Sequence, residues 1–74
     1  MRAVIIGAGK IGYNIAETLS QEGHDVFVIE KDEERQQVVE ENLDVQALLG
    51  NGADSRLLES IEIEKADLLI AVTE

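Results

Sequence analysis

Three glycines near the start of the chain have the spacing of a phosphate-binding turn. Gly7, Gly9 and Gly12 form a Gly-x-Gly-x-x-Gly pattern directly after the apolar run 3–6. In such a turn the first glycine permits a sharp change of direction, the second lets the backbone approach a diphosphate, and the third lets the next helix pack against the strand. Backbone amides and the positive end of the helix dipole then meet the ligand's charge. The pattern predicts a nucleotide-binding turn, and the alternative is a turn that only redirects the chain.

An acidic residue that could bind the same ligand as this turn stands at the end of the next apolar run. Glu30 closes the run 25–30 and lies 18 residues after Gly12 (30 − 12). At about 20 residues past the glycines, a carboxylate can accept hydrogen bonds from the 2′ and 3′ hydroxyls of the adenosine ribose and repel a 2′-phosphate. NAD(H) or an adenosine nucleotide is therefore favoured over NADP(H). Lys31 is a cation that could tolerate a phosphate beside the ribose, but no arginine follows immediately.

A second glycine-containing segment follows the third apolar run. Residues 50–54 read Gly-Asn-Gly-Ala-Asp, so positive φ angles and exposed backbone amides are available where a strand ends. Ligands lie at that edge of an open parallel sheet, which makes Asn51, Gly52 and Ala53 candidate ligand contacts. The alternative is a strand-to-helix turn with Asp54 or Ser55 as N-cap.

The hydrophobic pattern alternates strands with amphipathic helices. Strands are predicted over about 3–6, 25–30, 44–49 and 66–73, and helices over about 10–22, 33–42 with Asp32 as N-cap, and 55–61. The residues expected to face the sheet are Ile11, Ile15, Ala16 and Leu19, then Val38, Val39 and Leu43, then Leu57, Leu58 and Ile61. Right-handed crossovers give a Rossmann-like α/β fold, β-α-β-α-β-α-β, with a parallel sheet of order 3-2-1-4. This order would place Thr73, at the end of the fourth strand, beside the glycine turn.

Composition limits the classes of protein that the chain can represent. Its 74 residues include no cysteine and no proline and carry a formal net charge of -10. Disulfides and thiolate chemistry are therefore excluded, and the acidity argues against nucleic-acid binding. No apolar segment approaches the roughly 20 residues that cross a bilayer, so we expect a cytoplasmic location without direct membrane insertion. The predicted sheet is one mononucleotide half plus one strand, so residues 1–74 are expected to be a fragment or truncated domain.

Four stretches of the chain together resemble one family. They are residues 1–16 with the glycine turn, Val-Ile-Glu-Lys-Asp-Glu-Glu-Arg at 28–35, Gly-Asn-Gly-Ala at 50–53, and Ala-Asp-Leu-Leu-Ile-Ala-Val-Thr at 66–73. The chain is similar to the N-terminal domain of Trk-type potassium-uptake regulators, also called KTN or RCK domains. The resemblance implies a cytoplasmic regulatory domain that binds NAD(H), or ATP or ADP, and gates a potassium-translocating membrane protein. It also implies assembly into dimers or larger homo-oligomers.

The resemblance also implies roles for individual residues. The pyrophosphate would lie on Gly7, Ala8, Gly9, Lys10 and Ile11, and the adenosine ribose on Glu30. Asn51, Gly52 and Ala53 would line the adenine side, with Thr73 and Glu74 at the edge of the cleft. The Lys10 ammonium either meets phosphate as its amide does or is only solvated.

Two other functions are compatible with the residues. The same fold serves many enzymes, so the chain could be the cofactor domain of an NAD-dependent dehydrogenase whose substrate domain lies beyond residue 74. It could instead be a structural module with an empty cleft. We predict no catalytic role, because no set of acid, base and nucleophile is arranged around the glycine turn. Apolar surface along the fourth strand predicts self-association.

Overall fold

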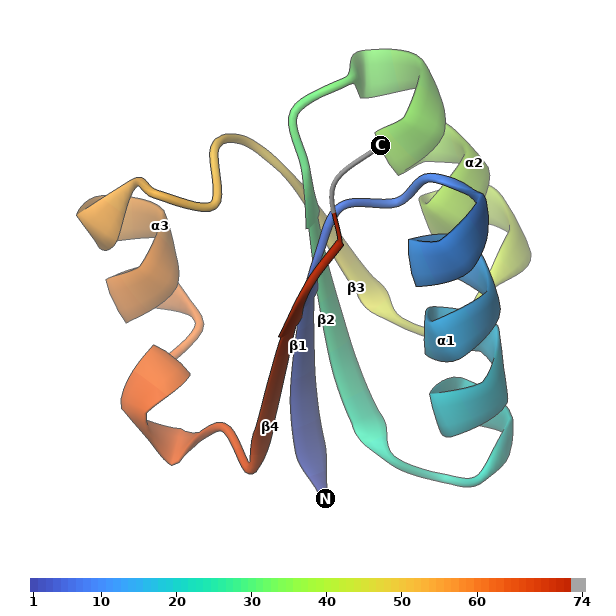
Figure 1. Ribbon diagram of the computed structural model, residues 1–74, viewed down its shortest axis with the longest axis horizontal. Helices are drawn as coiled ribbons and strands as arrows, with labels where there is room; N and C mark the ends of the chain where they lie inside the picture. Colours follow the sequence, from blue (N-terminus) through green and yellow to red (C-terminus); the bar gives the residue numbers. More distant parts are fainter. Residues whose placement is uncertain (73–74) are drawn as a thin grey trace.

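A four-stranded parallel sheet lies between helices on both faces in the computed structural model, which describes residues 1–72 (Figure 1). The elements in chain order are β1 (Arg2–Ile6), α1 (Lys10–Gln21), β2 (Asp25–Glu30), α2 (Glu33–Asn42), β3 (Gln46–Leu49), α3 (Ser55–Ser60), the 3₁₀ helix η1 (Ile63–Lys65) and β4 (Leu68–Ala71). The strand order is β3-β2-β1-β4. The predicted fold class and sheet order are confirmed.

The first strand occupies the middle of the sheet. Val4 pairs in register with Phe27 of β2 on one side and with Leu69 of β4 on the other. Ala3, Val4 and Ile5 are completely buried. A strand that is covered on both faces has no side that favours polar residues, which explains why the run is continuously apolar.

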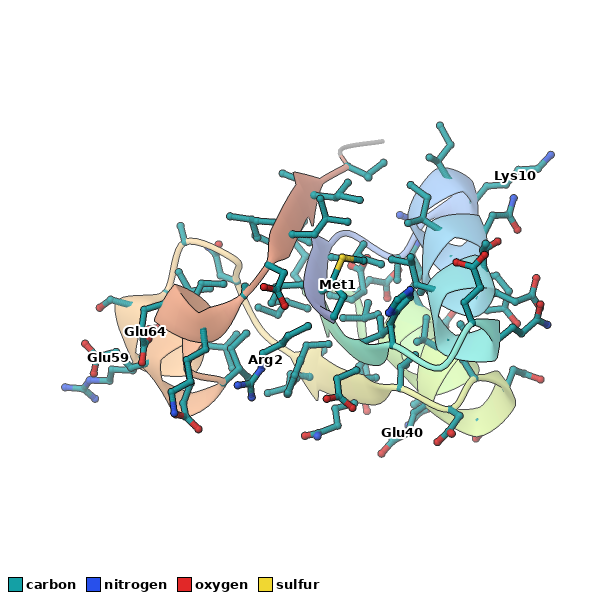
Figure 2. The ribbon with its side chains drawn as sticks, turned by 90° about the horizontal axis from the view of Figure 1, so that it is seen from below. Met1, Arg2, Lys10, Glu40, Glu59 and Glu64 are labelled. Atoms are coloured by element: carbon teal, nitrogen blue, oxygen red, sulfur yellow. The ribbon has the colours of Figure 1, made fainter. Side chains whose placement is uncertain are left out.

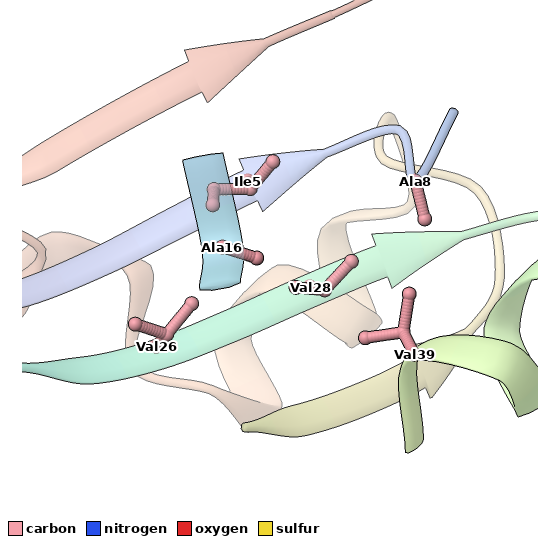
Figure 3. Packing of buried hydrophobic residues seen from close by; sticks show 6 residues of the cluster. All are labelled: Ile5, Ala8, Ala16, Val26, Val28 and Val39. Carbon is pink, nitrogen blue, oxygen red and sulfur yellow. The ribbon is translucent and has the colours of Figure 1, made fainter. Parts of the chain in front are cut away.

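Each face of the sheet has its own layer of helices. Helices α1 and α2 cover one face, and α3 with η1 covers the other (Figure 1). Figure 3 shows the core of the first face, where side chains of the sheet and helices meet: Ile5, Ala8, Ala16, Val26, Val28 and Val39. The core of the second face comprises Val4, Phe27, Ile29 and Ile61, with Leu57 and Leu58 packed against it. The predicted inward face of the third helix is thus confirmed.

Two predicted core residues face outward. Ile11 is 57% exposed because Gly12 and Ala16 form the buried face at this end of α1. Val38 is 48% exposed, whereas its neighbour Val39 is fully buried. Successive helical residues point about 100° apart, so one of two adjacent positions faces the sheet. The sequence pattern had assigned both Ile11 and Val38 to the core, which is wrong.

The last two strands begin later than predicted. Strand β3 starts at Gln46, and β4 starts at Leu68 because the chain first forms η1 after a left-handed residue, Glu62, at φ 54°. The Asp67 carboxylate then accepts a hydrogen bond from the backbone N–H of Arg2 at 2.8 Å and aligns the start of β4 with β1. No helix within residues 1–72 has the length and apolar character needed to cross a membrane.

Candidate functional site

The glycine turn joins β1 to α1 under tight steric limits. Gly7 has φ 106°, a conformation that side chains with a Cβ rarely adopt, and a Cβ there would overlap the carbonyl oxygen of Val72. A Cβ on Gly12 would overlap the carbonyl oxygen of Gly7. Gly9 is the N-cap of α1, and within residues 1–72 no side chain caps the start of this helix. The positive end of the α1 dipole therefore lies at the turn.

Glu30 lies directly against this turn and is only 5% exposed. Its Oε1 accepts a hydrogen bond from the backbone N–H of Ala8 at 2.7 Å, and its Oε2 accepts one from the N–H of Asp32 at 2.8 Å. Parallel pairing of β1 with β2 sets Ile6 beside Ile29, so the residues that follow meet at one edge of the sheet. The sequence-predicted acid and glycine turn are therefore in direct contact.

The environment of Glu30 favours its charged form. Burial raises the pKa of its carboxyl, but hydrogen bonds from the backbone amides of Ala8 and Asp32, together with the charge of Arg35, more than offset burial and leave the pKa below its ordinary value of 4.5. Each carboxylate oxygen can accept more than one hydrogen bond. A carboxylate that is held in place by two amides still has acceptor capacity for a ligand's hydroxyl groups.

A cleft of about 370 Å³ opens at the carboxyl ends of the strands. The sequence-predicted site residues that line it are Gly7, Gly9, Glu30, Lys31, Asn51, Gly52 and Ala53. Its other lining residues are Ile6, Ile29, Arg35, Gly50 and Val72. The two glycine segments and the acid, which are far apart in sequence, therefore share one cavity.

Several predicted site residues do not line this cleft. Ala8 is buried and contributes its N–H to Glu30, while Gly12 packs beneath the turn. Figure 2 shows the exposed Lys10 side chain extending away from the body of the domain. Ile11 is largely exposed. Thr73 and Glu74 lie outside the described residues.

The segment 50–54 lines the cleft with residues 50–53 and ends at Asp54, the N-cap of α3. The Asp54 carboxylate caps α3 by accepting a hydrogen bond from the N–H of Arg56 at 2.9 Å, as the turn interpretation predicts. The Asn51 side-chain oxygen accepts one from the N–H of Ala53, also at 2.9 Å. The N–H of Gly50 donates to the carbonyl of Glu30 at 2.9 Å. The segment that leads into the cap of α3 therefore also forms one wall of the cleft.

Arg35 is the charged cleft residue that was not among the predicted site residues. It lies in the first turn of α2, three residues after the N-cap Asp32, and lines the cleft together with Lys31. The helix start at Asp32 was predicted, and residues three apart lie on the same side of a helix. This spacing could have indicated that Arg35 lies near the cleft. Two cations thus flank the cleft of a chain whose net charge is -10.

The fold and this cleft define a Rossmann-like α/β domain. Residues 3–74 match the model of the TrkA-N domain. The chain is 51% identical over 73 residues to the Trk system potassium uptake protein trkA homolog 1 of Methanosarcina mazei, covering 99% of this chain and 17% of that protein. It belongs to the TrkA-N domain family.

Other relatives share the same region. The Trk system potassium uptake protein TrkA of Azorhizobium caulinodans is 42% identical, with 99% of this chain and 16% of that protein covered. The TrkA homolog of Pyrococcus abyssi is 38% identical, with 99% of this chain and 32% of that protein covered. The chain therefore spans between about a sixth and a third of the length of these curated relatives.

Proposed function

We propose that the cleft binds an adenine nucleotide and that NAD(H) is favoured over NADP(H). The contact between Glu30 and the glycine turn supports this proposal most strongly, because it sets a diol-binding acid next to a diphosphate-binding turn. The diphosphate would lie at Gly7, Gly9 and the start of α1, and the ribose diol at Glu30. The base would lie between Lys31 and the segment 51–53. ADP and ATP share the adenosine half of this ligand and are expected to use the same contacts.

A nearby cation does not alter the preference for a free 2′ hydroxyl. Glu30 is held ionised in the cleft by two backbone amides, so a 2′-phosphate would meet a fixed negative charge. Lys31 lies at the cleft, but its side chain is exposed and its charge is screened by solvent. NADPH is therefore expected to bind more weakly than NADH.

We further propose that the domain forms part of a regulatory protein that controls a potassium-translocating membrane protein. The names of the relatives, which are Trk system potassium uptake proteins, support this role. Nucleotide binding can regulate the partner only if the nucleotide has unequal affinity for two states of the assembled protein. We place the domain at the cytoplasmic side as a homo-oligomer that contacts the membrane through its partner, without enzymatic activity of its own.

A substitution at Gly9 separates binding from folding. The backbone of Gly9 is extended, with φ -69° and ψ -169°, so other residues can adopt it. Aspartate is also among the best N-cap residues. Gly9→Asp is therefore expected to preserve α1 while its carboxylate repels the diphosphate, which should weaken NADH binding by about tenfold or more, or about 1.4 kcal/mol. Gly9→Asn supplies a cap of similar size without the charge and is the matched control.

Calorimetric titration with NADH and NADPH, together with thermal unfolding, measures these effects. NADH at ten times its dissociation constant should add about 1.4 kcal/mol to the stability of the wild-type protein. A protein that no adenine nucleotide stabilises would contradict the binding proposal.

The regulatory role is tested by potassium uptake in cells that lack their own Trk regulatory protein. Gly9→Asp should alter the nucleotide dependence of uptake, and wild-type protein that leaves uptake unchanged would contradict that role.

A further inference from the structure

The end of the cleft beyond Glu30 has two opposed walls. One wall is the segment 50–53, which is attached to Glu30 through the 2.9 Å hydrogen bond from the N–H of Gly50 to the Glu30 carbonyl. The other is the start of α2, which is attached through the 2.8 Å hydrogen bond from the N–H of Asp32 to Oε2 of Glu30. Both walls are thus fixed to the residue that is proposed to hold the ribose, so the space between them is where the base attached to that ribose would lie.

Arg35 belongs to the second wall, and its charge favours the ionised Glu30 carboxylate without a hydrogen bond between the two side chains within residues 1–72. Within residues 1–72 it forms one ion pair, with 3.8 Å between its Nε and Oδ2 of Asp32, which is longer than a hydrogen bond. Its side chain is 49% exposed and lines the cleft. The opposite wall already uses the Asn51 side-chain oxygen and the Asp54 carboxylate in internal hydrogen bonds. Arg35 is therefore a planar group available to a ligand at this end.

The chemistry of the surroundings selects a flat, uncharged group as the partner of Arg35. A phosphate here would lie near the ionised Glu30, whereas an adenine ring carries no charge. A guanidinium stacks on aromatic faces through its plane, which an ammonium lacks. Resting on the nucleotide binding proposed above, we propose that Arg35 stacks on the adenine face that points away from segment 50–53 and so positions the base.

This role makes a distinct prediction about selectivity. Stacking acts on the π face that all bases share and contributes affinity without choosing between bases. Arg35→Ala should therefore weaken NADH, ADP and GDP by a similar factor of about five, and the ratio of ADP to GDP affinity should remain unchanged. The ratio of NADH to NADPH affinity should also remain nearly unchanged, because the proposal places Arg35 on the base and not on the 2′ position.

Calorimetric titrations with NADH, NADPH, ADP and GDP test the proposal. The four proteins are the wild type, Arg35→Ala, Arg35→Lys and Arg56→Ala. Arg35→Lys keeps the charge without the plane and should lose nearly as much affinity as Arg35→Ala. Arg56→Ala is the matched control, because Arg56 also follows a capping aspartate in the first turn of a helix but lies outside the cleft. It should bind like the wild type.

Three outcomes would overturn the assignment. Wild-type affinity in Arg35→Lys would mean that charge alone matters, and a greater loss for NADPH than for NADH would mean that Arg35 contacts a phosphate. Unchanged binding in Arg35→Ala would place the base elsewhere. In each case the wild type still binds NADH, so the proposed function stands, whereas a wild type that binds none of the four nucleotides would overturn both proposals.

Discussion

Replacing Gly12 with alanine is expected to lower the free energy of unfolding by about 2 to 4 kcal/mol. The usual effect of this change inside a helix has the opposite sign, a gain of about 1 kcal/mol. Here the new methyl group would overlap the carbonyl oxygen of Gly7 and lie 3.0 Å from its carbonyl carbon. Both atoms belong to the backbone, which the neighbouring strands hold in place. The overlap between the methyl group and the Gly7 carbonyl can therefore be removed only if α1 moves away from the sheet.

Urea denaturation monitored by circular dichroism measures this loss. A domain of this size has a total stability of about 4 to 11 kcal/mol, so the loss is a large fraction of it. Asn14→Ala is the control, since Asn14 lies two residues further along α1 on the exposed side. That change is expected to stabilise the helix by a few tenths of a kcal/mol. Greater stability in Gly12→Ala would show that helix and turn are not in close contact.

The second large effect is expected from Glu30→Gln. The two Glu30 oxygens accept hydrogen bonds from the N–H groups of Ala8 and Asp32, and glutamine has only one such oxygen. Its amide NH₂ would face one backbone donor in a nearly buried position. We expect a loss of about 1 to 3 kcal/mol in the free energy of unfolding. NADH affinity should fall by about tenfold or more if Glu30 also binds the ribose, since charged acceptors form stronger hydrogen bonds.

The pH dependence of this loss has a definite sign. The folded pKa of Glu30 lies below its ordinary value of 4.5, so its carboxylate stabilises the folded state fully above the unfolded pKa. That contribution disappears as the pH falls through the lowered folded pKa. The difference in unfolding free energy between wild type and Glu30→Gln should thus be constant near neutral pH and shrink below pH 4.5. A control, Glu41→Gln at an exposed position, should show little difference.

The features that depend on local spacing could be predicted from the sequence. Gly7, Gly9 and Gly12 stand in a pattern whose backbone requirements are known, and Asp32 precedes a helical pattern as an N-cap should. The position of Glu30 at the end of an apolar run, combined with right-handed crossovers, was enough to place it at the edge of the sheet that holds the glycine turn. The fold and most of the cleft follow from these few rules.

The features that depend on how helices rest on the sheet could not be predicted. Ile11 and Val38 fit an amphipathic pattern, but the rotation of each helix about its axis decides which of several apolar positions is buried. The position of Arg35 in the cleft could not be predicted for the same reason, because the direction of its side chain depends on how α2 docks on the sheet. The hydrogen bond from Ala8 to Glu30 requires the backbone path of the turn in three dimensions. Residue spacing alone does not contain that information.

The central place of β1 has a consequence for synthesis of the protein. Ala3 pairs with Leu68, so β1 leaves the ribosome 65 residues (68 − 3) before the partner on one of its edges. At roughly 5 to 20 residues per second, that delay is about 3 to 13 s. During this interval one edge of this largely buried strand has no neighbour and remains open to chaperones and to other nascent chains. The sheet is completed from its middle outward, and its earliest strand waits longest for its final contacts.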